Sequence, residues 1–204
     1  IINVTNYCNG KIINDNLVTV VTPCYNQAKY LRESIESVLK QTYSNIEYLL
    51  YDDGSTDDTW SIMQEYALKD YRIKATKLDK QSNVAIVLNR SISEMRGKFW
   101  VWCPADDIFH PYLLEEKYKN SEMFKHECVL YSDWVHMDKN GEDIGHISPK
   151  SMTPEEFNIE VWNSSPIGFT GIWIPKHIFN KVGKFPEHLQ FSEDFYWMIK
   201  ATIY

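Results

Sequence analysis

The sequence has no apolar run that approaches the roughly 20 residues of a transmembrane helix, and it shows no signal peptide. Its first residue is Ile rather than Met, so targeting stays open. Basic residues are also scarce: 21 Lys and Arg stand against 28 Asp and Glu, for a formal net charge of -7. Without a basic stripe, such a chain would be repelled by nucleic acid, so we expect no nucleic-acid partner. An anionic ligand would need a metal ion or a local cluster of hydrogen-bond donors.

Cysteine is scarce as well, and the four cysteines form no C-x-x-C pair. Two of them lie in apolar runs, so we expect reduced core residues of a cytoplasmic protein. No internal repeat or low-complexity segment interrupts the chain. With 44% hydrophobic residues, 204 residues can bury one good core. We therefore expect one domain in residues 17–204, an amino-terminal arm in residues 1–16, and a missing carboxyl-terminal segment.

Short apolar and β-branched runs alternate with amphipathic stretches through the first half of the chain. The runs predict strands at residues 17–22, 46–51, 73–78 and 99–103, and the first of them fits a strand buried on both faces. Apolar residues that recur every three or four positions predict helices at residues 28–41, 59–68, 84–95 and 112–123. Strands and helices in this alternation form right-handed crossovers around a mainly parallel sheet. The expected fold class is therefore α/β, with a Rossmann-like sheet flanked by helices.

The second half, residues 112–204, is more irregular and more aromatic. We expect two strands and two short helices there, at residues 128–132, 171–174, 176–181 and 195–203. A polar hairpin around residues 139–141 and a loop rich in Ser and Pro should separate the two strands. This half should cover one end of the sheet and form the wall against which an acceptor binds.

The stretch at residues 98–111 is a strand that runs into a proline and two adjacent carboxylates, Asp106 and Asp107. Open α/β sheets bind ligands just beyond the carboxyl ends of their strands, and neighbouring carboxylates repel unless a cation lies beside them. The pair therefore suggests Mg2+ or Mn2+, which would complete its coordination with water and substrate phosphates. A solvated acidic turn that leads into the next helix is the simpler alternative.

Four polar clusters follow the predicted strands at the same end of the sheet, at residues 22–26, 52–57, 80–83 and 106–107. In such a sheet the first two loops flank the crevice for a nucleotide. Tyr25 could stack on a base, and Asp52 or Asp53 could accept hydrogen bonds from a base or a ribose. Alternatively, Tyr25 packs within its loop and the two acids form a turn in which Gly54 takes a positive φ.

Four segments together resemble the family 2 glycosyltransferases with the GT-A fold, at residues 18–26, 51–57, 105–107 and 192–194. They occur in the family's order, and the resemblance extends from about residue 17 to the end of the chain. It implies a nucleotide-sugar-binding half in residues 17–111 and an acceptor-side half in residues 112–204.

The resemblance also assigns roles to individual residues. It implies that the nucleotide-sugar donor is held by Pro23, Tyr25, Asp52, Asp53, Lys80 and Asp106. It places the metal on Asp106 and Asp107. The catalytic base would be Asp194, the second acid of the pair that it forms with Glu193. Helix capping after Ser192 is the alternative for that pair.

Three positions depart from the family's pattern. Pro104 stands where relatives usually have an acid, which removes one candidate metal ligand. Asp58 replaces a glycine, and the frequent Asn-x-Gly before the third helix is absent because Asn83 is followed by Val84 and Ala85. These departures point to a weakened or unusual donor site.

The resemblance implies transfer of a sugar, with inversion, from a UDP-sugar to a hydroxyl of a saccharide or lipid-linked acceptor in cell-surface polysaccharide synthesis. The enzyme would work in the cytoplasm, with peripheral association at the inner face of the cell membrane left open. A nucleotidyltransferase is a rival, although residues 22–26 lack the Gly-rich phosphate loop that it normally needs. An inactive nucleotide- or carbohydrate-binding module is the second rival.

Overall fold

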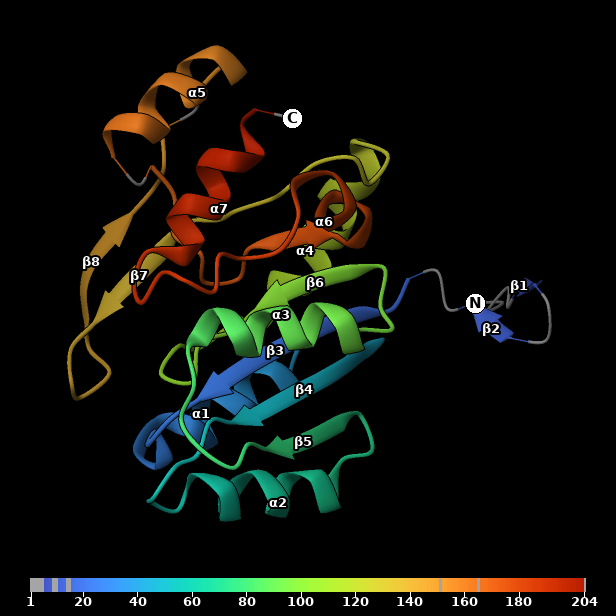
Figure 1. Ribbon diagram of the computed structural model, residues 1–204, viewed down its shortest axis with the longest axis vertical. Coiled ribbons are helices and arrows are strands. Elements are labelled where there is room, and N and C mark those ends of the chain that lie inside the picture. Colours follow the sequence, from blue (N-terminus) through green and yellow to red (C-terminus); the bar gives the residue numbers. More distant parts are fainter. Residues whose placement is uncertain (1–5, 9–10, 14–15, 151, 165, 204) are drawn as a thin grey trace.

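A five-stranded sheet forms the centre of the computed structural model, which describes residues 6–8, 11–13, 16–150, 152–164 and 166–203. The sheet has the order β5-β4-β3-β6-β9, with the first four strands parallel and β9 antiparallel to β6 (Figure 1). Its strands are β3 (Val18–Cys24), β4 (Ile46–Asp52), β5 (Ile73–Lys77), β6 (Phe99–Trp102) and β9 (Trp173–Pro175). The predicted α/β class and the predicted strands of the first half are confirmed.

Strands β3 and β4 are buried along almost their whole length because both of their faces are covered. This explains why they are continuous apolar runs rather than alternating ones. Their register pairs Cys24 with Asp52, and β5 continues it by pairing Asp52 with Lys77. The carboxyl ends of three strands are therefore level, and the loops that follow them start from one edge.

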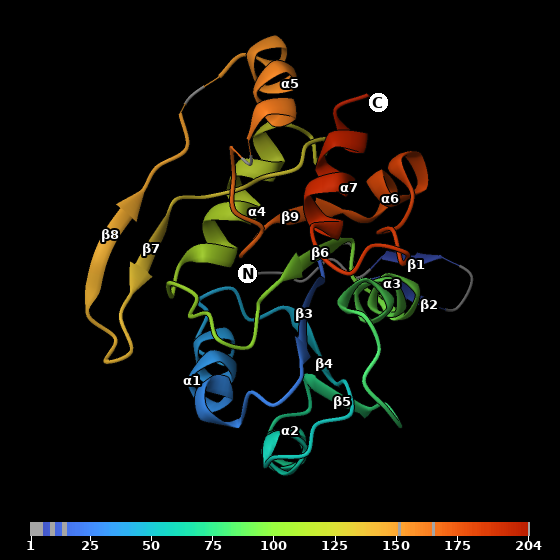
Figure 2. The same ribbon diagram turned by 60° about the vertical axis from the view of Figure 1, so that its left-hand side comes forward.

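Helices cover both faces of the sheet (Figure 2). Apolar side chains of α1 (Ala28–Leu39), α2 (Thr59–Lys69) and α4 (Leu113–Met123) share one core. Those of α3 (Val84–Glu94), α6 (Lys176–Val182) and α7 (Glu193–Ala201) share the other. The predicted helices are confirmed, with ends that differ by up to two residues. Both cores contain residues from before and after residue 112, so the second half packs on both faces of the sheet.

The second half contains two elements that differ from expectation. Residues 128–132 form no strand: within them only Leu130 pairs, in an isolated bridge to Trp173. The predicted Ser- and Pro-rich loop contains a helix, α5 (Pro154–Asn163), which starts with a capping box between Thr153 and Glu156. A capping box satisfies backbone N–H groups at both residues, which explains a stable helix start at this point.

Two hairpins lie apart from the central sheet. Strands β7 (Trp134–Met137) and β8 (Asp143–Ile147) form the predicted polar hairpin and project from one side of the molecule (Figure 1). In the predicted arm, β1 (Asn6–Cys8) pairs with β2 (Lys11–Ile13), whereas residues 1–5, 9–10 and 14–15 lie outside the described part. Within the described ranges, no helix is both long enough and apolar enough to cross a membrane.

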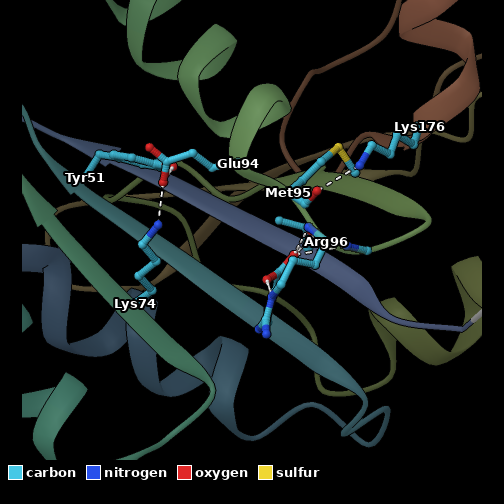
Figure 3. A network of polar contacts seen from close by, with 9 residues as sticks. Tyr51, Lys74, Glu94, Met95, Arg96 and Lys176 are labelled. Carbon is cyan, nitrogen blue, oxygen red and sulfur yellow. Dashed lines mark hydrogen bonds and ion pairs between the residues drawn. The ribbon is translucent and has the colours of Figure 1, made fainter. Parts of the chain in front are cut away.

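A polar network holds the sheet together at the amino ends of the strands. The buried Glu47 of β4 accepts hydrogen bonds from Thr19 Oγ1 at 2.5 Å and from the backbone N–H groups of Arg96 at 2.5 Å and Gly97 at 3.0 Å. Figure 3 shows Arg96 near a second cluster, in which Glu94 pairs with Lys74 at 2.6 Å. These contacts join the turn before β6 to β3 and β4.

Candidate functional site

The loops after β3 and β4 are locked together by hydrogen bonds. Asn26 has a left-handed backbone, with φ 54°, and its N–H donates to Ser55 Oγ at 2.9 Å. Its side-chain oxygen accepts from Thr56 N at 2.8 Å. Pro23 lies half-buried at the end of β3, and the next loop residue, Tyr25, is 39% exposed. Tyr25 is therefore presented at this edge on a fixed loop rather than buried within it.

Asp52 is the last residue of β4. Its carboxylate is fully buried, and within the described part of the chain only one of the two oxygens accepts a hydrogen bond. Its Oδ1 accepts from Ser55 N at 2.9 Å, whereas its Oδ2 is buried and has no hydrogen-bond partner among the residues that the structure describes. Lys77 Nζ lies 3.7 Å from that oxygen, which is close enough for attraction but too long for a hydrogen bond. Buried acceptors are normally paired, so an unpaired one at a ligand-binding edge marks a position for a donor from outside the chain.

The neighbouring Asp53 is already satisfied within the protein. Its two oxygens accept from Ser82 N at 3.0 and 3.1 Å, and Ser82 Oγ donates to it at 2.7 Å. Gly54 allows the two loops to approach this closely, because a Cβ at this position would lie 2.6 Å from Gln81 N. The clasp brings the exposed Lys80 to the same edge, as predicted. Asp53 thus joins the loop after β4 to the loop after β5, and its contact with a nucleoside stays a prediction.

Asp106 and Asp107 follow β6 but differ in surroundings. Asp106 is exposed, and within the described residues nothing donates a hydrogen bond to its carboxylate. Asp107 is half-buried and accepts from Thr170 Oγ1 at 2.5 Å. Burial raises the pKa of Asp107, the Thr170 bond lowers it, and the charge of Asp106 raises it further, for a net increase. Helix α1 anchors the loop, because Ser34 Oγ donates to Pro104 O at 3.1 Å.

The acids of the two loops surround the same strand end. Burial raises the pKa of the Cys24 thiol, at the end of β3, well above its ordinary value. The charges of Asp52 and Asp106 raise it further, so both carboxylates lie within electrostatic range of one sulfur atom. Asp52 and Asp106 therefore lie near the end of β3, and the hydrogen bonds from Ser82 to Asp53 hold the loop after β5 against the loop after β4.

Glu193 and Asp194 form the first turn of α7, which lies on the same side of the molecule as the arrowheads of β3 and β4 in Figure 1. The segment before this turn is attached to α3: the Asn83 side-chain amide donates to Leu189 O. Burial raises the pKa of Glu193, and the charge of Asp194 adds to the rise. Within the described residues, neither acid is hydrogen-bonded or ion-paired to the carboxylates after β4 and β6.

The capping alternative for this pair has some support, because Asp194 Oδ1 accepts a hydrogen bond from the backbone N–H of Phe195, in the first turn of α7, at 2.7 Å. Ser192 has a left-handed backbone, and its side chain makes no capping hydrogen bond to α7. Asp194 is half-exposed while Glu193 is 6% exposed, so Asp194 is the more accessible acid of the two.

Lys77 and Thr170 lie at this edge but were not predicted, and for Ser82, in the predicted cluster at residues 80–83, the contact with Asp53 was not predicted. Each contacts a carboxylate of another element, and Thr170 lies 63 residues from the one that it contacts. Adjacent carboxylates, one of them unengaged, offer the hard oxygen donors that Mg2+ and Mn2+ prefer, so the pair fits such an ion with substrate phosphates as further ligands. In the described part, no group of three or more His, Cys, Asp or Glu side chains could hold a metal ion.

A cavity of about 440 Å³ lies elsewhere, between α5, α7 and residues 129–131. Its lining is mostly apolar and includes Phe157, Ile172, Trp197 and Met198. None of the predicted site residues contributes to it, so this cavity is distinct from the edge described above.

Known proteins resemble the chain in sequence and in fold. An uncharacterized glycosyltransferase of Rickettsia bellii is 32% identical over 184 residues, covering 88% of this chain and 26% of that protein. The putative teichuronic acid biosynthesis glycosyltransferase TuaG of Bacillus subtilis is 29% identical over 143 residues, covering 69% of this chain and 56% of TuaG. The chain therefore spans much less than the full length of these relatives.

A solved structure has the same fold. Residues 1–349 of Staphylococcus aureus TarS, in complex with UDP-GlcNAc, match with a TM-score of 0.72 and 25% identity, over 91% of this chain and 53% of that one. Residues 19–183 match the sequence profile described as Glycosyl transferase family 2, a match that ends before Glu193 and Asp194. With more than half of its length matched, the chain belongs to glycosyl transferase family 2 and has the GT-A fold.

Proposed function

We propose that this chain binds a nucleoside-diphosphate sugar, a UDP-sugar, and transfers the sugar with inversion to a hydroxyl of a saccharide or lipid-linked acceptor. The observation that carries this proposal is the gathering of acids at one strand edge. Two of their carboxylates, those of Asp52 and Asp106, have an oxygen without a hydrogen-bond donor from the described residues. Such free oxygens could accept hydrogen bonds from the N–H groups of a base, and they could also bind a cation that is held by the phosphates.

The donor would bind across the loops after β3, β4 and β5. Tyr25 offers an exposed ring for the base, next to Pro23, and Asp52 Oδ2 offers the unpaired acceptor for a base N–H. Asp53 would act through Ser82, by fixing the loop that carries Lys80. The Lys80 ammonium would offset part of the diphosphate charge.

Asp106 and Asp107 would hold Mg2+ or Mn2+. When bound, the ion neutralises negative charge that develops on the departing diphosphate. Pro104 removes a third candidate carboxylate, so the phosphates of the donor must supply more of the coordination than in relatives with an acid there. We therefore expect the ion to bind weakly without nucleotide.

Asp194 would accept the proton of the acceptor hydroxyl while that oxygen attacks the anomeric carbon from the face opposite the leaving group. The first turn of a helix stabilises the anion and so weakens a base, whereas a neighbouring acid strengthens it. Glu193 supplies that neighbour, because it is buried and lies next to Asp194 in the same turn. Its role would be to assist Asp194, which is the base.

The relatives support the choice of donor and pathway. The TarS structure contains UDP-GlcNAc, and TuaG is named for teichuronic acid biosynthesis. On this support we propose a role in cell-surface polysaccharide synthesis. We further propose that the reaction takes place on the cytoplasmic side, with peripheral attachment to the membrane where the acceptor is lipid-linked.

A thermal-shift screen of UDP-, GDP- and TDP-sugars, with and without Mn2+, tests donor binding, because a ligand of the folded state raises its Tm. UDP-sugars should raise Tm most. Asp194→Asn should keep this shift but lower transfer by about two to four powers of ten, the usual contribution of a general base. Glu33→Gln makes the same carboxylate-to-amide change at an exposed position of α1, so it is the matched control and should change neither.

Three outcomes would contradict the proposal. If none of the donors raises the Tm under any condition, the chain does not bind a nucleotide sugar. Release of pyrophosphate instead of nucleoside diphosphate would identify a nucleotidyltransferase. Saturable UDP binding without turnover, across a panel of acceptors and metals, would identify a binding module.

A further inference from the structure

Thr170 joins the acceptor-side half of the chain to the acidic pair. Its hydroxyl donates to Asp107 Oδ2 at 2.5 Å, across 63 residues of sequence. It arrives there because β9 runs antiparallel to β6, so the residues before β9 meet the residues after β6. The neighbouring Gly171 N–H donates to Trp102 O, at the end of β6, at 2.8 Å.

The segment around Thr170 has little room to move. A Cβ on Gly168 would lie 3.3 Å from the Trp134 ring, and one on Gly171 would lie 3.0 Å from Leu113 Cδ2. Gly171 also has φ +67°, a conformation that side chains other than glycine rarely adopt. Thr170 is therefore held between two closely packed glycines, and its hydroxyl occupies a fixed place.

We propose that Thr170 is a positioning residue for the metal: it fixes Asp107 so that the acidic pair presents one arrangement of oxygens to the ion. This inference rests on the proposed function. Two adjacent carboxylates repel and would otherwise turn apart, and Asp107 is half-buried, where water screens that repulsion poorly. The Thr170 hydroxyl engages one oxygen and leaves the other, together with the whole Asp106 carboxylate, for the ion.

A merely structural clasp would make a different prediction. It would lower the stability of the fold when removed but would leave the affinity of the folded protein for metal unchanged. A positioning role predicts a loss of metal affinity in protein that is still folded, since hydrogen-bond partners of metal ligands typically contribute about 10- to 100-fold to affinity.

The test is calorimetric titration of Mn2+ into the UDP-saturated protein, for the wild type and for Thr170→Val, which removes only the hydroxyl. The variant should bind Mn2+ about 10-fold more weakly or worse, by the magnitude typical of such partners. Thr170→Ser keeps the hydroxyl and should bind as the wild type does. Thr42→Val is the matched control, because Thr42 Oγ1 donates to Glu115 at 2.7 Å on an exposed surface.

A double-mutant cycle assigns the effect to Asp107. In an Asp107→Asn background, Thr170→Val should have little further effect on Mn2+ affinity, because the carboxylate that it positions is gone. Circular dichroism and UDP affinity measured without metal verify the fold of each variant. If Thr170→Val fails to fold, the comparison of Thr170→Ser and Thr170→Ala takes its place.

Wild-type Mn2+ affinity in folded Thr170→Val would overturn the inference. So would a Thr170→Ser variant as weak as Thr170→Val, or an equal loss in the Asp107→Asn background. If the wild type itself binds no UDP, the proposed function fails instead, and the two failures are thereby distinguished.

Discussion

The buried carboxylate of Glu47 offers a strong test of how the sheet is held together. Its Oε1 accepts three hydrogen bonds, from Thr19 Oγ1 and from the backbone of Arg96 and Gly97, and its Oε2 accepts one from Arg96 Nε at 2.6 Å. Replacement by Ala removes all four at once. Replacement by Gln keeps the first oxygen but points an amide donor at the guanidinium.

The expected loss of stability depends on how deeply each hydrogen-bond donor is buried. The Arg96 side chain is 75% exposed, so water replaces its half of the ion pair at little cost. The other three donors are buried or partly buried, and each lost hydrogen bond costs about 1 kcal/mol. Glu47→Ala should therefore lower the free energy of unfolding by about 3 kcal/mol, which corresponds to a fall in Tm of roughly 6–12 °C for a chain of this size. Glu47→Gln should cost about half as much.

Lowering the pH should reduce the difference in free energy of unfolding between the wild type and Glu47→Ala. Burial raises the pKa of Glu47, but hydrogen bonds from Thr19, Arg96 and Gly97 outweigh it and hold the pKa below its ordinary value of 4.5. A carboxyl with a lowered folded-state pKa stabilises the protein above its unfolded pKa, and that contribution is lost as the pH falls through the folded value. The gap between wild type and Glu47→Ala should thus be full at pH 7 and shrink below pH 4.5.

Urea unfolding followed by tryptophan fluorescence measures both effects. Glu65→Gln is the control, because Glu65 pairs with Arg32 and Lys69 on the surface, where screening leaves little to lose. A Glu47→Ala variant within about 1 kcal/mol of wild type, on the scale of a single hydrogen bond, would refute the reasoning. A gap that stays constant from pH 7 to pH 3 would refute it as well.

Three further predictions follow from single contacts. Gly54→Ala should destabilise by about 2 kcal/mol or more, because it strains a φ of +80° and meets Gln81 N, and urea unfolding measures the loss. Lys117→Met should stabilise by about 1–3 kcal/mol at pH 7, because the Lys117 amine is buried without a partner. Burial lowers the pKa of Lys117 to about 7, so wild-type stability should rise from pH 7 to 10.5, a rise that unfolding of the variant should lack. Asp52→Asn should weaken UDP binding about 10- to 100-fold by calorimetry, and unchanged affinity would exclude Asp52 from the donor site.

The first half of the fold was predictable because three of its strands, β3, β4 and β6, are buried on both faces, whereas the edge strand β5 is only partly buried. Burial of β4 along its whole length leaves a sequence signal that needs no partner to be recognised. The second half depends on tertiary placement. Residues 128–132 resemble a strand, but only Leu130 meets a partner, and that partner, Trp173, is brought there by the short β9.

Helix α5 could have been predicted. Thr153 and Glu156 form a capping box with proline at the first helical position, which is a local signal for a helix start. As a group, the surrounding Ser and Pro residues favour a loop, whereas a proline at the first helical position favours a helix.

The site was predictable where chain direction alone determines position. Parallel strands with a common direction must bring Asp52 and Asp106 to one edge, whatever the details of packing. Which acid of each pair is hydrogen-bonded to a distant residue was not predictable. Asp53 is engaged by Ser82, 29 residues away, and Asp107 by Thr170, and neither partner leaves a signal near the acid in the sequence.

The reversed direction of β9 bears on how such proteins diversify. The chain leaves the carboxyl-end edge of the sheet after β6 and returns to that edge before β9. The segment from α4 to Thr170 therefore begins and ends at one place. Evolution can lengthen, shorten or exchange such a segment without shifting the acids at the strand ends. Under the proposed function, new acceptor preferences should therefore arise first in the hairpin and helix of this segment, while the strand ends stay as they are.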